Sequence, residues 1–168
     1  MNSLNIFRNE FLNANSWAQR KDGVPLFLLD NLSREERVIA EAELIASANG
    51  KDSWPVLGLA HLKSVRALPL LYNLLDKYEG KQKLTIAYAI YKICNDIGMA
   101  DIVITEIPRV TGELDLIEIL YLLPEIKDDR ITALLNSYRE HKDYLIAYNA
   151  TRALGLSTDE VVRKFRGS

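Results

Sequence analysis

The chain has 168 residues, of which 48% are hydrophobic and 26% are charged, and it carries a formal net charge of −2. This composition is typical of a water-soluble globular domain, and a chain of this length buries roughly two thirds of its unfolded surface without disulfides or a structural metal. No stretch of the sequence approaches about 18 consecutive apolar residues, the length that a transmembrane helix requires. The sequence therefore predicts no insertion into a membrane.

The first eleven residues mix apolar side chains with Asn2, Asn5, Arg8, Asn9 and Glu10. They lack the basic start and the unbroken apolar stretch of a secretory signal peptide. We therefore expect the protein to be cytoplasmic.

Charge is unevenly distributed along the chain. Residues 1–95 contain 12 Lys or Arg and 10 Asp or Glu, residues 96–129 contain 2 and 9, and residues 130–168 contain 7 and 4. The central segment is therefore strongly acidic, with a net charge of −7. Nucleic-acid binding requires a continuous basic face that displaces counterions from phosphates, so this distribution argues against a nucleic-acid partner.

Apolar residues recur at spacings of three and four along nearly the whole chain, which predicts an all-α fold. The pattern places helices at residues 4–18, 24–32, 34–48, 54–62, 65–78, 82–97, 100–107, 113–123, 129–140, 144–154 and 158–165. Predicted helix starts are two capping boxes and two first-turn prolines: Ser33 with Glu36, Ser157 with Glu160, Pro25 and Pro55. Predicted helix stops are the glycines that follow periodic stretches: Gly50, Gly80, Gly112 and Gly155.

The sequence also repeats itself, because a shift of 30 residues aligns similar side chains. Four apolar columns result: Trp54, Leu84, Leu114 and Tyr144; Val56, Ile86, Leu116 and Ile146; Leu57, Ala87, Ile117 and Ala147; and Ala60, Ile90, Leu120 and Ala150. A second helix in each unit is indicated by a further column of Leu44, Leu74, Ile104 and Leu134. A pair of helices with such faces can bury them only against neighbouring pairs, so the repeat predicts a curved stack of helical hairpins.

Residues 56–75 resemble a HEAT-like repeat, whose units combine an alanine-rich first helix, a short polar turn and an Arg-Ala-x-Pro-x-Leu second helix. Residues 144–165 resemble a second unit, through Ala147, Ala150, Ala153, Leu154 and Gly155. The resemblance implies a right-handed α-solenoid of about five helical hairpins in one domain, residues 1–168. A capping helix is then expected at residues 1–23 and the repeats at residues 24–165.

Residues suited to catalysis are sparse. His61 and His141 are 80 residues apart, and neither is followed by glutamate as in the iron-binding pairs of HEAT-like hydroxylases, so we expect both at the surface. Cys94 is the only cysteine and ends an apolar run, which favours a buried core thiol over a nucleophile. We therefore predict a protein that is not an enzyme and that uses no metal and no cofactor.

The resemblance leaves one enzyme class to weigh in particular. HEAT-like DNA glycosylases handle damaged bases with aromatic and acidic side chains on a basic concave face, and Trp17, Trp54, Tyr91 and Asp101 are the candidates for that role here. Trp54 begins a repeat and occupies a core column, which favours packing. The acidic central segment also disfavours DNA.

The acidic segment has two interpretations. Its carboxylates come from three adjacent helical units, and they form either solvated helix faces or a docking surface for a basic protein, where complementary charge speeds encounter. Tyr91 and Tyr121 align with His61 and Thr151 in a semi-exposed column and are candidate interface anchors. The candidate partner-binding residues are Asp101, Glu106, Glu113, Asp115, Glu118, Tyr91, Tyr121, Glu125, Asp128 and Asp129.

These observations favour a non-enzymatic protein binder. Free-standing HEAT-like solenoids of this size are similar to immunity proteins of bacterial contact-dependent growth-inhibition systems. That similarity implies an antitoxin, a monomer that neutralises a basic toxin domain, such as a nuclease, in a 1:1 complex. The alternatives are a scaffold or assembly chaperone for a cytosolic complex and a HEAT-like enzyme such as a DNA glycosylase or a bilin lyase subunit.

Overall fold

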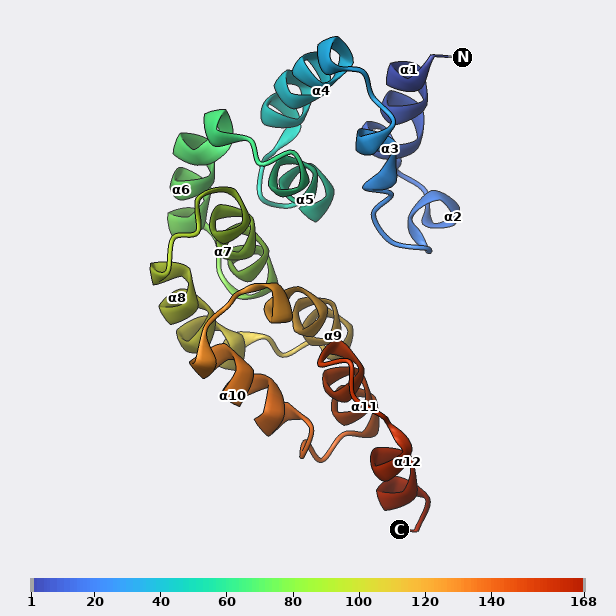
Figure 1. Cartoon of the computed structure of the whole chain (residues 1–168), viewed down its shortest axis with the longest axis vertical. Coiled ribbons are helices and arrows are strands. Elements are labelled where there is room, and N and C mark those ends of the chain that lie inside the picture. Colours follow the sequence, from blue (N-terminus) through green and yellow to red (C-terminus); the bar gives the residue numbers. More distant parts are fainter. Residues whose placement is uncertain (1, 168) are drawn as a thin grey trace.

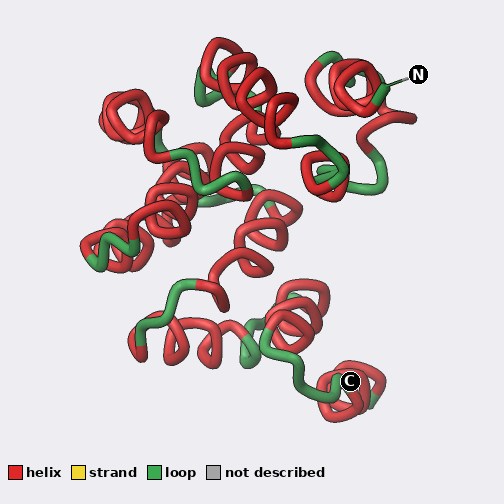
Figure 2. The backbone as a smooth tube through the Cα atoms, turned by 45° about the horizontal axis from the view of Figure 1, so that its top comes forward, coloured by secondary structure: helices red, strands yellow, loops and turns green. Residues whose placement is uncertain are grey.

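The computed structural model describes residues 2–167, and it is 73% helix with no strand among these residues. Figure 2 shows helices joined by loops along the whole described chain. The prediction of an all-α fold is therefore confirmed. None of the helices that the structure describes is long and apolar enough to cross a membrane.

Eight of the helices form two rows that follow the same arc (Figure 1). The row that we call the inner row contains α5 (Ser53–His61), α7 (Gly80–Cys94), α9 (Glu113–Leu122) and α11 (Tyr144–Ala153). The outer row contains α4 (Arg34–Ser47), α6 (Leu68–Lys77), α8 (Gly98–Glu106) and α10 (Asp129–Tyr138). Each inner helix packs against the next inner helix, and each outer helix packs against an inner helix beside it in sequence. Consecutive helices therefore alternate between the two rows.

The N-terminal segment differs from the single helix predicted for residues 4–18. It contains α1 (Ser3–Phe7), a π-helical turn η1 (Arg8–Leu12), α2 (Trp17–Arg20) and α3 (Phe27–Asp30). A new helix starts at Ser16 because its hydroxyl accepts from the backbone N–H of Gln19, whose side chain accepts in return from the backbone N–H of Ser16. The helix predicted at residues 24–32 is likewise longer than α3.

The remaining elements are short. Three 3-10 turns, η2 (Val65–Ala67), η3 (Ile107–Arg109) and η4 (Leu123–Glu125), lead into α6 or follow α8 and α9. Proline occupies the first turns of η3 and η4, where its missing N–H costs no helical hydrogen bond. Beyond the two rows, α12 (Asp159–Arg166) packs against α11.

One of the two predicted capping boxes is present. The hydroxyl of Ser33 accepts from the backbone N–H of Glu36 at 3.2 Å, and the carboxylate of Glu36 accepts from the backbone N–H of Ser33 at 2.9 Å. The box predicted at Ser157 and Glu160 is wrong. Thr158 precedes α12 without a side-chain cap, and the hydroxyl of Ser157 accepts from the backbone N–H two residues later instead.

The predicted glycine stops are correct at two positions. Gly50 and Gly155 follow α4 and α11 with φ of 75° and 71°, a region that only glycine adopts without strain. A Cβ at Gly50 would also lie 2.4 Å from the ring of Tyr78. Gly80 has a positive φ but begins α7, and Gly112, with φ of −80°, precedes α9 as its N-cap. The last two glycines therefore mark starts of helices rather than ends.

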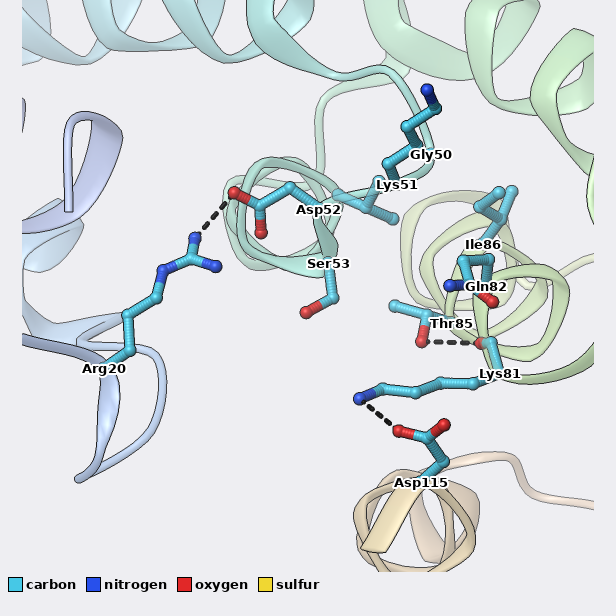
Figure 3. Close-up of a pocket in the computed structure, with 11 residues that line it drawn as sticks. Arg20, Gly50, Lys51, Asp52, Ser53, Lys81, Gln82, Thr85, Ile86 and Asp115 are labelled. Carbon is cyan, nitrogen blue, oxygen red and sulfur yellow. Dashed lines mark hydrogen bonds and ion pairs between the residues drawn. The ribbon is translucent and has the colours of Figure 1, made fainter. Parts of the chain in front are cut away.

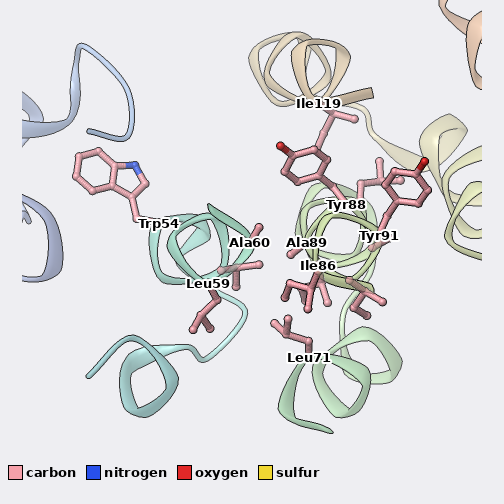
Figure 4. Close-up of a cluster of buried hydrophobic side chains, with 14 of the residues drawn as sticks. Trp54, Leu59, Ala60, Leu71, Ile86, Tyr88, Ala89, Tyr91 and Ile119 are labelled. Carbon is pink, nitrogen blue, oxygen red and sulfur yellow. The ribbon is translucent and has the colours of Figure 1, made fainter. Parts of the chain in front are cut away.

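Two of the four apolar columns belong to the core, and Figure 4 shows Ala60 and Ile86 of these columns among the buried side chains. Their members are all buried: Val56, Ile86, Leu116, Ile146, Ala60, Ile90, Leu120 and Ala150. In the column that begins at Trp54, two of the four residues are buried as predicted, but Leu114 and Tyr144 are 71% and 37% exposed. Trp54 is buried because Phe11 and Arg20 from the N-terminal segment pack against its ring.

The interpretation of Cys94 as a buried core thiol is wrong, because the side chain is exposed. Cys94 is the last residue of α7, and Asn95 ends that helix in the left-handed conformation, with φ of 55°. The apolar face of α7 therefore ends at Ile93, one residue before the cysteine.

The buried columns yield a test of the fold. Ala150→Asp should unfold the protein at room temperature or lower the free energy of unfolding by about 3 kcal/mol or more, because a carboxylate at this fully buried position has no partner. Ala133→Asp, on the exposed face of α10, is the matched control and should melt like the wild type. Thermal and urea denaturation followed by circular dichroism measures both. Equal stability of the two variants would contradict the packing described here.

Candidate functional site

The ten residues predicted to bind a partner do not form one surface. Glu113, Asp115, Glu118 and Tyr121 lie on α9 of the inner row. The other six belong to the end of α7 and to the segments from α8 to the start of α10: Tyr91, Asp101, Glu106, Glu125, Asp128 and Asp129. The arrangement of helices thus divides the acidic segment into two groups with different surroundings.

Two of the predicted partner-binding residues are inside the protein, so the prediction is wrong for them. Glu106 is 3% exposed, and its carboxylate accepts from the backbone N–H of Gly80 at 2.6 Å. A carboxylate is favourable there because the first amides of a helix have no helical acceptor. Tyr91 is 9% exposed, and its hydroxyl accepts from the backbone N–H of Lys127 at 3.0 Å. Both residues are structural contacts between neighbouring elements.

Basic side chains of the same molecule neutralise most of the remaining acids outside α9. Arg130 lies 2.6 Å from Asp101 and 2.8 Å from Asp128. Its hydrogen bonds to Asp128 hold the pKa of that carboxyl below its ordinary value. Glu125 forms an ion pair with Lys92 and accepts from the hydroxyl of Tyr88. These carboxylates already have partners, and only the exposed Asp129 remains beside them without an ion pair in the described chain.

Two acids of α9, Asp115 and Glu118, meet Lys81 of α7. The ammonium of Lys81 lies 2.9 Å from Asp115 (Figure 3) and 2.5 Å from Glu118. Burial alone would lower the pKa of Lys81, but its hydrogen bonds to Glu118 and Asp115 outweigh burial and raise the pKa above its ordinary value. Lys81 therefore stays charged and bridges α7 and α9.

A second pair of carboxylates lies at the starts of α9 and α11. Glu113 begins α9, and Asp143 caps α11 by accepting from the backbone N–H of Ile146. Partial desolvation and then repulsion from Asp143 raise the pKa of Glu113 above its ordinary value. Neither carboxylate has an ion pair with a basic side chain within residues 2–167. Together with Asp115, Glu118 and Lys81, this pair carries a formal charge of −3, and we call these five side chains the acidic group.

Exposed apolar side chains adjoin this acidic group. Leu114 and Tyr121 of α9 are 71% and 42% exposed, and Tyr144 and Leu145 of α11 are 37% and 44% exposed. The two helices pack against each other, and the hydroxyl of Tyr121 donates to the side chain of Asn149 across their contact at 2.7 Å. We call this surface the α9–α11 face, made of Glu113, Leu114, Asp115, Glu118, Tyr121, Asp143, Tyr144 and Leu145.

Sequence reasoning identified half of the α9–α11 face. The repeat predicts core positions for Leu114 and Tyr144, and it does not single out Asp143 or Leu145. The missing signal was present in the repeat, because Asp143 follows Glu113 by the same 30 residues that align the apolar columns. That register predicts two carboxylates at equivalent ends of neighbouring helices.

A groove lies next to this face, between the N-terminal segment and the inner row. It contains two hollows of about 350 and 410 Å³, both lined by Arg20, Ser53, Lys81 and Thr85. Arg20 forms one wall: its guanidinium donates to Asp52 at 2.6 Å (Figure 3) and lies 4.4 Å from the ring centre of Trp54. The lining alternates basic and acidic side chains, so it favours no single charge of ligand.

The residues weighed for enzymatic roles are dispersed. His61 lies 2.7 Å from Asp30, and a ring nitrogen of His141 accepts from the backbone N–H of Asp143. Within residues 2–167 no three His, Cys, Asp or Glu side chains gather as a metal ion would require. Of the residues considered for a glycosylase, Trp17 is exposed, Trp54 and Tyr91 are buried, and Asp101 is paired with Arg130.

Comparison with known proteins adds no relative to this description. A scan against models of protein families, a search of curated proteins and a search of solved structures find no match. The geometry and charge of the α9–α11 face are therefore the features that bear on function.

The carboxylate pair yields a test by titration. Asp143→Asn keeps a helix-capping side chain but removes the neighbouring charge, so it should lower the pKa of Glu113 toward its ordinary value. In the wild type, repulsion disfavours folding above the raised pKa and vanishes as the pH falls through it, so mild acidification should stabilise the wild type more than the variant. Carboxyl NMR titration and melting at several pH values measure this. Asp129→Asn is the control, and an unchanged pKa of Glu113 in Asp143→Asn would refute the pairing.

Proposed function

We propose that this protein is a non-enzymatic protein-binding module, a right-handed α-solenoid of about five HEAT-like helical hairpins that binds a basic protein surface through its α9–α11 face. The alternation of helices between two rows, together with the 30-residue register of the buried columns, supports the solenoid. In such a stack the surfaces of successive helices add up to one extended binding face.

A single observation carries the proposal: exposed leucine and tyrosine side chains lie beside carboxylates that lack basic partners in the described chain. Large apolar side chains gathered at a surface are typical of interaction sites, and tyrosine contributes contact area at low cost in conformational entropy. The Glu113 and Asp143 carboxylates repel each other, and a lysine or arginine of a partner would relieve that repulsion. The partner that fits is therefore apolar at its centre and basic at its rim.

Within this class, an immunity protein is the function that these features favour. A toxin domain that acts on nucleic acid carries basic charge for its substrate, and a stoichiometric inhibitor needs only to cover that surface. The α9–α11 face supplies both the apolar contact and the opposite charge. On this proposal a monomer in the bacterial cytoplasm neutralises a toxin of the contact-dependent growth-inhibition type in a 1:1 complex. An assembly chaperone for a basic subunit would use the same face.

Charge reversal on α9 tests the proposal. The double variant Glu113→Lys and Glu118→Lys should weaken binding of a basic partner by about 2 kcal/mol or more, roughly thirtyfold in Kd, while leaving the helices folded. Asp129→Lys and Asp159→Lys make the same change of charge at exposed acids outside the α9–α11 face and should bind like the wild type. The protein to be tested as partner is the product of the neighbouring gene, and calorimetry at low and high salt measures affinity.

Raised salt should weaken the wild-type complex and affect the α9 variant less, because ions screen the attraction that the variant has lost. Tyr121→Ala should weaken binding at both salt concentrations. If the α9 and control variants bind alike, the partner uses another surface. Turnover of a small molecule by the purified protein would instead favour an enzyme.

A further inference from the structure

We propose that the hollow between α11 and α12 receives one apolar side chain of the partner, and that a lysine or arginine adjacent to it pairs with Glu113 and Asp143. This inference rests on the proposed function and specifies where the partner is anchored and which short sequence it presents. The hollow has a volume of about 370 Å³ and is lined by Tyr144, Val162, Phe165 and Arg166. Figure 1 shows α12 beside α11, with α9 on the other side of α11.

The walls of the hollow are mostly apolar and are held in place by contacts between rings. The ring of Tyr144 lies 5.4 Å from that of Phe165 in an edge-on arrangement and 5.6 Å from that of Tyr148. Val161 is buried and fixes α12 against α11, whereas Val162 and Phe165 are only half-buried. An apolar side chain that enters the hollow would remove these surfaces and its own from water.

The charges around the hollow define what lies next to that side chain. Asp143 directly precedes Tyr144 in the chain, so one carboxylate of the pair that it forms with Glu113 belongs to the residue before a wall of the hollow. Arg166 lines the hollow itself and repels a second cation. The partner segment that fits the hollow therefore has a basic residue on the side of its apolar residue toward α9. On the side toward α12 it has a neutral or acidic residue.

Three acetylated and amidated tripeptides test this pattern by NMR titration of the ¹⁵N-labelled full chain. Lys-Leu-Ser should shift the backbone amides of Tyr144, Leu145 and residues 161–166. Glu-Leu-Ser reverses the charge and Lys-Ser-Ser removes the apolar group, so each should bind at least about threefold more weakly. Equal binding of all three peptides, or shifts that leave α12 untouched, would overturn the inference.

Variants of the protein complete the experiment. Val162→Lys places an ammonium in the hollow and should weaken Lys-Leu-Ser at least about threefold. Arg163→Gln, at an exposed position of the same helix, should leave its affinity unchanged. If Val162→Lys loses the amide signals typical of a folded α12, Val162→Thr takes its place, because it keeps the side-chain shape and replaces a methyl with a hydroxyl. Val162→Thr should also lower the affinity for Lys-Leu-Ser.

Other outcomes separate this inference from the proposed function. If a second copy of the chain covers the hollow, the protein sediments as a dimer at NMR concentration and the peptides do not titrate, which overturns the inference. If Lys-Leu-Ser shifts amides of α9 but none of α12, the hollow is not the anchor and the proposed binding by the α9–α11 face stands. If peptides titrate as expected but the α9 variants bind the whole partner normally, the proposed function fails alone.

Discussion

The burial of α7 is the constraint on which the rest of the structure depends. This helix packs against α5, α6, α8 and α9, and nine of its fifteen residues are buried (Figure 4). A helix that is covered on nearly every side places its polar groups at its ends or extends them to its neighbours. Lys81 reaches the acids of α9 from the first turn, and the hydroxyls of Tyr88 and Tyr91 reach the segment after α9. Burial, and then the neighbouring Glu125, raises the pKa of Tyr88, which keeps its hydroxyl protonated as a donor.

This packing also decides which acidic side chains are free to act on a partner. Carboxylates near the outer row meet Arg130, Lys92 and the amides at the start of α7, and their charge is used within the protein. Among the described residues, the basic partner of the α9 carboxylates is Lys81, which Asp115 and Glu118 share. An ion pair on a protein surface contributes little to stability, so the function of such charge is better sought in recognition.

On the proposed function, recognition by the α9–α11 face combines two effects that act at different distances. Uncompensated negative charge attracts a basic partner before contact and raises the rate of association. Leu114, Tyr121, Tyr144 and Leu145 act only at contact, where removing their apolar surface from water slows dissociation. The hollow beside α12 adds shape to this surface, because its ring contacts are already formed without a guest. On this proposal the α9–α11 face selects both the charge and the size of the partner's side chain.

Four features could be predicted from the sequence alone: the all-α class, the capping box at Ser33, most helix boundaries in the two rows and the two fully buried columns. They follow from local propensity and from the spacing of apolar residues along one helix. Spacing does not specify which end of a column is covered by other parts of the chain. The packing of the chain is needed to see that the N-terminal segment covers Trp54 while Leu114 is exposed. It is also needed to see that the buried face of α7 ends at Ile93, which leaves Cys94 exposed. It alone also sorted one acidic segment into a buried cap at Glu106, a cluster neutralised by Arg130 and an unpaired couple at Glu113 and Asp143. The partners of a charge lie about thirty residues away on neighbouring helices, so electrostatic surroundings are a property of packing and not of local sequence.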